Sequence, residues 1–232
     1  MRIPAWLPAV LTLCACSADG RPDEPTPATP RPLPEDVHLR LGAEQLVPDA
    51  LPAGWGVAET NGAGLPATWS ARAAPAAGLA LHVMTTNAGS TYNLLLSPEA
   101  LPADLELSVR VRADTGEEDQ GGGLVWRAQG PDDYYVARWN PLEDNVRVYK
   151  VEGGVRTLFQ NADVEAAADG WHTLGVTMIG DRITVALDGE PLLDTLDETF
   201  PGAGRVGLWT KADACTWFDE LVVREPRWPE ER

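Results

Sequence analysis

The chain has 232 residues, 44 % of them hydrophobic, which is enough to bury the core of one sizeable domain with terminal tails or of two small domains. It carries 35 acidic side chains against 18 lysines and arginines, so its formal net charge is −17. Such an excess of carboxylates repels the phosphates of nucleic acids and of anionic lipids. Nucleic acid is therefore not an expected partner, and docking to a membrane by charge alone is not expected.

The N-terminus has the features of a secretory signal. A short positive start is followed by an apolar stretch over residues 3–13, which is too short to span a membrane. Residues 13–16 read Leu-Cys-Ala-Cys and resemble the bacterial lipobox, with the small residue Ala15 directly before the cysteine that would receive the lipid, Cys16. We predict a signal peptide over residues 1–15 and a lipoprotein of the bacterial cell envelope, periplasmic or in the outer membrane. The alternative is an ordinary secretory signal with incidental cysteines.

Composition divides the rest of the chain into a tether, a domain and a tail. Residues 16–40 are rich in Pro, Asp and Glu, and proline at this density cannot pair in a sheet and favours extended conformations. We predict a tether over residues 16–40, a folded domain over 41–225 and a polar tail over 226–232. With Cys16 lipidated, Cys215 is the one cysteine of the mature chain, so neither an intrachain disulfide nor a cysteine zinc site is expected.

From residue 55 onward, short runs of alternating apolar and polar residues are separated by turns rich in Gly, Pro and Asp. They recur at intervals of about 8–12 residues, which is typical of an all-β domain. The predicted strands are WGVAE (55–59), TWSARA (68–73), LALHVM (79–84), YNLLLS (92–97), DLELSVRVRA (104–113), LVWRAQ (124–129), YYVARWN (134–140), NVRVYKV (145–151), VRTLFQ (155–160), two hairpins within 171–196, GRVGLWTK (204–211) and CTWFDELVV (215–223).

The two hairpins within 171–196 turn at Gly180-Asp181 and at Asp188-Gly189, and Asp-Gly between alternating runs is a strong hairpin signal. No helix longer than a turn or two is predicted, and residues 161–170 are expected to form a small helix or a loop. Evenly spaced turns favour one sandwich over two domains. We therefore predict an all-β fold, an antiparallel two-sheet jelly-roll sandwich.

The three central strands give the clearest alternation. One face is apolar and is predicted to be the core side: Leu124, Trp126, Ala128, Tyr135, Ala137, Trp139, Val146 and Val148. The other face carries Arg127, Tyr134, Arg138, Asn140, Arg147 and Tyr149. Guanidinium groups donate paired hydrogen bonds to hydroxyls or carboxylates, and aromatic rings stack on sugars, so this face is a candidate binding face. The alternative is a plain solvent-facing sheet surface, where Arg and Tyr are also good strand residues.

Two loops extend the candidate binding face. Glu143 and Asn145 stand at the turn of the same hairpin, where a loop can cap a groove. A second group, Trp209, Lys211 and Asp213, lies on a later strand and the loop after it. Trp209 could be a sugar platform, although a strand tryptophan is more often part of a core.

Three segments together resemble the concanavalin A-like lectin/glucanase superfamily, in particular its 3-keto-disaccharide hydrolase-like, family 16 glycoside hydrolase-like and LamG-like domains. They are GGLVWRAQGPDDYYVARWNPLEDNVRVYK (122–150), GWHTLGVTMIGDRITVALDGEPLLD (170–194) and GRVGLWTKADACTWFDELVV (204–223). The resemblance implies two curved sheets with a concave face that often meets carbohydrate. It also implies that, if calcium is bound, Asp219 is the candidate ligand; no other cofactor is expected.

Catalytic motifs are missing. The family 16 pattern Glu-x-Asp-x-x-Glu is absent, as is a Gly-x-Ser-x-Gly elbow, and Glu106 is the single glutamate inside a strong strand pattern. We therefore predict a lipid-anchored carbohydrate-binding module that does not cleave its ligand. Two alternatives stay open: a hydrolase of glycosides or 3-keto-disaccharides, for which Glu106 is the candidate catalytic residue, and an adhesion or scaffold module that binds protein.

Overall fold

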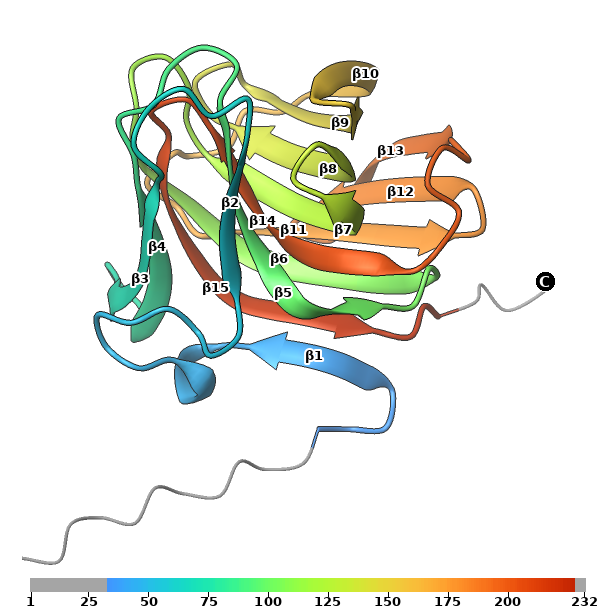
Figure 1. Ribbon diagram of the computed structural model, residues 1–232, viewed down its shortest axis with the longest axis horizontal. Coiled ribbons are helices and arrows are strands. Elements are labelled where there is room, and N and C mark those ends of the chain that lie inside the picture. The colour runs from blue at the N-terminus through green and yellow to red at the C-terminus, as the bar shows by residue number, and fades with distance from the viewer. Residues whose placement is uncertain (1–32, 228–232) are drawn as a thin grey trace, which may run out of the picture. The chain divides into compact units, whose positions relative to one another are not determined.

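The computed structural model describes residues 33–227, in which the chain forms fifteen strands and one short 3-10 helix, η1 (Ala43–Gln45) (Figure 1). The predicted signal peptide, Cys16 and most of the predicted tether lie outside the described residues. Within residues 33–227, no helix is long and apolar enough to cross a membrane. The strands form two antiparallel sheets, so the predicted all-β sandwich is confirmed.

One sheet has eight strands. Their order is β13 (Glu190–Leu196), β12 (Arg182–Leu187), β11 (His172–Ile179), β6 (Leu105–Thr115), β15 (Cys215–Arg224), β4 (Leu79–Met84) and β3 (Thr68–Ala73), with β1 (Val37–Leu41) paired to the second half of β15. The other sheet has seven strands. Their order is β10 (Val155–Asp163), β9 (Asn145–Glu152), β8 (Asp133–Asn140), β7 (Gly122–Gly130), β14 (Gly204–Lys211), β5 (Tyr92–Leu101) and β2 (Gly56–Thr60).

The main core lies between the two sheets, where one face of each strand is apolar. Every predicted strand is present, and both hairpins turn where Gly180 and Asp188 predicted. Of the apolar face predicted for the central strands, all members except Ala128 belong to this core, including the large rings of Trp126, Tyr135 and Trp139. Burial of such rings removes a large apolar area from water and is the main stabilising contribution expected for a sandwich.

The boundary of the domain differs from the prediction. The proline-rich tether was predicted to reach residue 40, but β1 begins at Val37 and pairs with Arg224 at the end of β15. The segment VHLRL contains no proline, so its backbone N–H groups are free to form the ladder that the prolines before it cannot form. Residues 37–40 are therefore part of the sheet.

Strands β7 and β8 leave no room for a side chain at Gly123. A Cβ atom built there overlaps the carbonyl oxygen of Ala137 in β8, a backbone atom that cannot move without disturbing the ladder. Gly202, in contrast, is exposed, and a Cβ atom there meets nothing within 4 Å.

The substitution Gly123→Ala is therefore expected to lower the free energy of unfolding by about 2–3 kcal/mol or more, because overpacking against backbone forces the two strands apart. Gly202→Ala is the matched control and should stay close to the unsubstituted protein. Urea unfolding followed by tryptophan fluorescence measures both. Equal stabilities for the two variants would contradict the close approach of β7 and β8.

Candidate functional site

The outer face of the seven-stranded sheet carries a second buried layer. Asn61, just after β2, donates a hydrogen bond of 2.9 Å to the carbonyl of Gly154 in the turn between β9 and β10, so the two edges of this sheet meet. This curl shields the outer face from water. The buried layer, called the outer layer below, consists of Tyr92, Leu94, Leu96, Val125, Ala128, Tyr134, Val136, Tyr149, Val151 and Trp209.

Arg156 on β10 covers the aromatic part of the outer layer. Its guanidinium carbon lies 4.5 Å from the ring centre of Tyr149, 5.1 Å from that of Tyr92 and 5.8 Å from that of Trp209. Cation–π attraction holds the guanidinium group over these rings. One of its nitrogens, Nη1, is buried and has no hydrogen-bond partner. Arg156 is thus pre-positioned by the rings while its own hydrogen-bonding capacity is incompletely used.

Trp209 and Tyr134 form the floor of this arrangement. The Trp209 indole N–H donates to the Tyr134 hydroxyl at 3.2 Å, and the Thr60 hydroxyl lies 2.8 Å from the same oxygen. Burial raises the pKa of Tyr134, so it stays protonated. Because Trp209 is only 1 % exposed, the expectation that it serves as an open sugar platform is wrong for this structure.

Beside the rings lies a charged group centred on Glu143. Arg138 donates to Glu143 Oε2 at 2.7 Å and to Asn145 Oδ1 at 2.6 Å, and Arg147 donates to the same Glu143 oxygen at 2.9 Å. Burial alone would raise the pKa of Glu143, but the hydrogen bonds from Arg138 and Asn145 and the charge of Arg147 outweigh it and hold the pKa below its usual value. Arg138 and Arg147 are direct partners across β8 and β9, so alternation places them correctly on one face.

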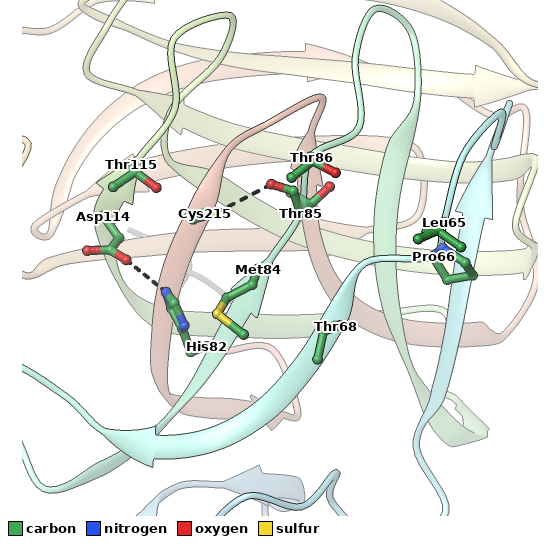
Figure 2. A pocket seen from close by; sticks show the side chains of 10 residues that line it. All are labelled: Leu65, Pro66, Thr68, His82, Met84, Thr85, Thr86, Asp114, Thr115 and Cys215. Atoms are coloured by element: carbon green, nitrogen blue, oxygen red, sulfur yellow. Dashed lines mark hydrogen bonds and ion pairs between the residues drawn. The ribbon is translucent and has the colours of Figure 1, made fainter.

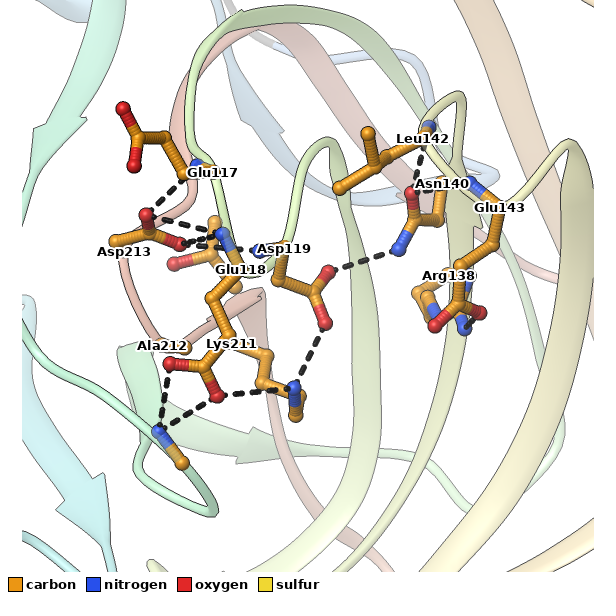
Figure 3. A network of polar contacts seen from close by, with 12 residues as sticks. Glu117, Glu118, Asp119, Arg138, Asn140, Leu142, Glu143, Lys211, Ala212 and Asp213 are labelled. Atoms are coloured by element: carbon orange, nitrogen blue, oxygen red, sulfur yellow. Dashed lines mark hydrogen bonds and ion pairs between the residues drawn. The ribbon is translucent and has the colours of Figure 1, made fainter.

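A second polar group, shown in Figure 3, joins the first at the end of the sheet. Asp119 accepts hydrogen bonds from Lys211 at 3.0 Å and from Asn140 at 2.9 Å. Burial raises the pKa of Asp119 despite the charge of Lys211. Asn140 joins the two groups, because its amide donates to Asp119 and its Oδ1 accepts a hydrogen bond of 3.2 Å from the backbone N–H of Glu143. The sequence pattern missed Asp119 because it stands in a turn, where alternation assigns no direction.

Asp213 and Glu118 hold the loops around this group. The Asp213 carboxylate accepts hydrogen bonds from the backbone N–H groups of Glu117, Glu118 and Asp119 at 2.7–3.1 Å (Figure 3). The Glu118 carboxylate accepts from the N–H of Gly89 at 2.8 Å in the loop between β4 and β5. Asp213 therefore fixes the loop of residues 117–119 next to the site. Its carboxylate oxygens are already occupied by hydrogen bonds from backbone N–H groups.

Arg127 does not belong to the binding face. Its φ of 48° and the shifted register between Trp126 and Gly130 mark a bulge in β7. A bulge inserts a residue and breaks the alternation, which moves Ala128 to the outer layer and turns Arg127 away from it. The guanidinium is 1 % exposed and donates to three backbone carbonyls at 2.9 Å, those of Ala103, Gly180 and Phe200. The prediction that Arg127 lines the binding face is wrong. Its side chain instead joins three separate turns and loops through the carbonyls of Ala103, Gly180 and Phe200.

The two remaining candidates lie on the outer face of the eight-stranded sheet, away from these groups. Glu106 is 3.9 Å from Arg224, and Asp219 accepts a hydrogen bond of 3.0 Å from Arg110. Burial raises the pKa of Asp219 and outweighs the hydrogen bond from the backbone N–H of Glu220 and the pairing with Arg110. Among residues 33–227, no three His, Cys, Asp or Glu side chains stand close enough to hold a metal ion.

The chain matches no known family model and no curated protein. Solved structures share its fold. The carbohydrate-binding module CBM66 from Bacillus subtilis superposes with a TM-score of 0.62 at 20 % identity, over 74 % of this chain and 96 % of that one. The cellulose-induced protein Cip1 gives 0.56 at 11 % identity (76 % and 94 %), and the Emp47p carbohydrate recognition domain 0.51 at 14 % (81 % and 98 %). At these identities the likeness establishes the fold, a concanavalin A-like sandwich.

The Asp213 loop contacts predict a pH-dependent effect of Asp213→Asn. Removing the charge should cost about 1–2 kcal/mol of unfolding free energy at neutral pH, the scale of hydrogen bonds to a charged acceptor. Burial raises the pKa of Asp213, but the three backbone donors outweigh it, so the folded-state pKa lies below the ordinary 3.8. The stabilisation is therefore complete above that value and is lost as the pH falls through the folded-state pKa.

Urea unfolding from neutral pH down to about pH 3 measures this difference. The exposed Asp169→Asn is the control and should change little at any pH. A cost for Asp213→Asn that does not shrink in acid would show that the carboxylate charge is not what orders the loop.

Proposed function

We propose that the chain is a carbohydrate-binding module whose ligand lies on the outer face of the seven-stranded sheet. The observation that carries the proposal is the charged group around Glu143. Two arginines fix one carboxylate oxygen at 2.7 and 2.9 Å, so the donors and the acceptor are held in one geometry before a ligand arrives. Such pre-organisation reduces the entropy lost on binding.

The exposed members of the group suit hydroxyl groups. The side chains of Arg147, Glu143 and Lys211 are 30 %, 43 % and 17 % exposed, so a ligand can reach both donors and an acceptor. A sugar hydroxyl both donates and accepts, and it can use both kinds of group at once. A polyanion is disfavoured by the net charge of −17.

Apolar contact is available next to the polar groups. Leu158 on β10 is the direct partner of Tyr149, lies on the same face and is 49 % exposed, and Leu142 at the β8–β9 turn is 48 % exposed. The C–H faces of a sugar ring pack against such side chains. The folds of a carbohydrate-binding module and of a carbohydrate recognition domain, as the names of those proteins have it, support the same proposal.

Two substitutions test the site. Arg147→Ala and Arg156→Gln should each weaken binding of a glycan found on an array of neutral and acidic sugars by about tenfold or more, because each removes hydrogen-bond donors worth about 1–3 kcal/mol. Calorimetric titration measures the affinity. Arg182→Ala is the control: this arginine lies on β12 in the other sheet, is 61 % exposed and pairs with Asp194.

Two outcomes would overturn the proposal that the chain binds carbohydrate. One is the absence of binding across the whole array by the unsubstituted chain. The other is a stable protein partner that co-purifies with the chain while no sugar binds, which would favour the scaffold alternative. Equal loss of affinity in Arg182→Ala would move the site to the other sheet.

One observation favours hydrolysis as a second candidate function. Asp119 and Glu143 both bond Asn140, which donates to Asp119 Oδ1 at 2.9 Å and accepts from the Glu143 N–H at 3.2 Å, and the pKa is raised for Asp119 by burial and lowered for Glu143 by its arginine partners. Opposite shifts of this kind are used in acid–base pairs of glycoside hydrolases. Release of reducing sugar that disappears in both Asp119→Asn and Glu143→Gln would replace the non-catalytic proposal, and binding without turnover would reject hydrolysis.

We also propose that Cys16 anchors the chain to the bacterial cell envelope. The support is the residue pattern before Cys16, in which the small residue Ala15 directly precedes the cysteine. Expression in a bacterium followed by detergent phase partition should place the unsubstituted chain in the detergent phase and Cys16→Ser in the aqueous phase. Cys14→Ser is the matched control and should behave as unsubstituted; partition of Cys16→Ser into detergent would contradict lipidation at Cys16.

A further inference from the structure

A pocket opens on the outer face of the eight-stranded sheet, at the end where β4 leads into the β4–β5 loop and β15 begins (Figure 2). Its volume is about 480 Å³, within the usual range for small-molecule sites. Four neighbouring strands contribute outward-facing side chains to it: Thr68 from β3, His82 and Met84 from β4, Asp114 from β6 and Cys215 from β15.

The lining suits a neutral polyhydroxyl ligand. Thr68, Thr85, Thr86 and Thr115 contribute hydroxyls, Asp114 contributes a carboxylate, and no Lys or Arg is among the ten lining residues. Leu65, Pro66 and Met84 add apolar surface. Hydroxyls and carboxylates accept the hydrogen bonds that sugar hydroxyls donate, whereas an anionic ligand would find no positive partner there.

His82 marks the floor of the pocket as a polar site that is not fully satisfied. Its side chain is 7 % exposed, its ring stacks on Trp217 at 3.9 Å, and its Nε2 lies 3.0 Å from Asp114 Oδ2. The other ring nitrogen, Nδ1, is buried without a hydrogen-bond partner. Buried polar atoms are normally paired, so His82 keeps one hydrogen-bonding atom unused in the wall of the pocket.

The pocket continues around the end of the sandwich. A second hollow of about 570 Å³ shares four lining residues with it, Thr85, Thr86, Thr115 and Cys215. The far side of this hollow is lined by Glu118 and Asp213, which belong to the polar group of Lys211 and Asp119 on the other sheet (Figure 3). The two hollows therefore adjoin as one groove, and its second part reaches Glu118 and Asp213, which contact Lys211 and Asp119 beside the proposed binding face.

We propose that the ligand is a neutral oligosaccharide chain that runs from the outer face of the seven-stranded sheet, over the loops, into the His82 pocket. This inference rests on the proposed function, which supplies the occupant of the first part of the path. A single sugar on the sheet face would leave both hollows empty. A chain of several units fills them and gains contacts with each added unit.

The length of the ligand provides the test. The probes are β-1,4-linked gluco-, manno- and xylo-oligosaccharides of one to six units, titrated calorimetrically into the full chain. At least one series should bind with an affinity that rises about tenfold or more from the shortest binding member to the hexamer, since each tenfold step corresponds to one or two added hydrogen bonds.

Two variants test whether the rise in affinity with ligand length comes from contacts in the groove. Thr86→Trp places a large ring at an exposed position where the two hollows join, and should abolish the gain with length while leaving the affinity for short members unchanged. Thr173→Trp, at an exposed position on β11 outside the groove, is the matched control. An affinity independent of length, or a gain that survives Thr86→Trp, would overturn the inference while the proposed function stands. Failure of every series to bind would count against the proposed function itself.

Cys215 gives a second readout, because its thiol lines both hollows and is free. Carbamidomethylation of Cys215, followed by peptide mass spectrometry, should slow several-fold in the presence of a saturating hexamer. Saturation with the shortest binding member should leave the rate unchanged. Equal protection by short and long members, or no protection by the hexamer, would show that the chain does not enter the groove.

Discussion

The curl of the seven-stranded sheet is the constraint on which the proposed site depends. In a flat sheet, Arg156 on the edge strand β10 would be several strands away from Tyr92 on β5. The bond between Asn61 and Gly154 closes the edges toward each other, and the guanidinium group then reaches the rings of three other strands. The same closure buries Tyr134, Tyr149 and Trp209, which provides a rigid base beneath the charged residues. The curvature of the sheet therefore both positions Arg156 at the proposed site and buries the rings of the outer layer.

Alternation predicts strands and their core side well, because it depends only on neighbours two residues apart. It places Trp126, Tyr135 and Trp139 in the core between the sheets and puts Arg138, which is buried, and Arg147 together on the other face of their sheet, as the structure has them. It fails where the ladder departs from regularity. The positive φ of Arg127 has no signal in a run that otherwise reads as an ordinary strand, so the bulge and the side chain it redirects could not be predicted.

Contacts made by curvature are also invisible to a local pattern. The position of Arg156 over Tyr92 depends on how far the whole sheet bends, and neither residue differs in its neighbours from many other strand residues. Asp119 lies in a turn, and the direction of its side chain is set by hydrogen bonds from Lys211 and Asn140, which lie far away in the sequence. The candidate face was thus predictable as a surface, whereas its chemistry required the fold.

Strand β15 relates the groove to the point where the chain enters the domain. It begins at Cys215 in the groove and ends at Arg224 beside Val37, ten residues or about 30 Å away at roughly 3.3 Å per residue. Because the two strands are antiparallel, the N-terminus of β1 and the N-terminus of β15 lie at opposite ends of the pair. Tension between a polymer held in the proposed groove and the chain before β1 would load the β1–β15 ladder in shear, so that its hydrogen bonds share the force and do not open one after another. This pairing is mechanically suited to holding a ligand that pulls.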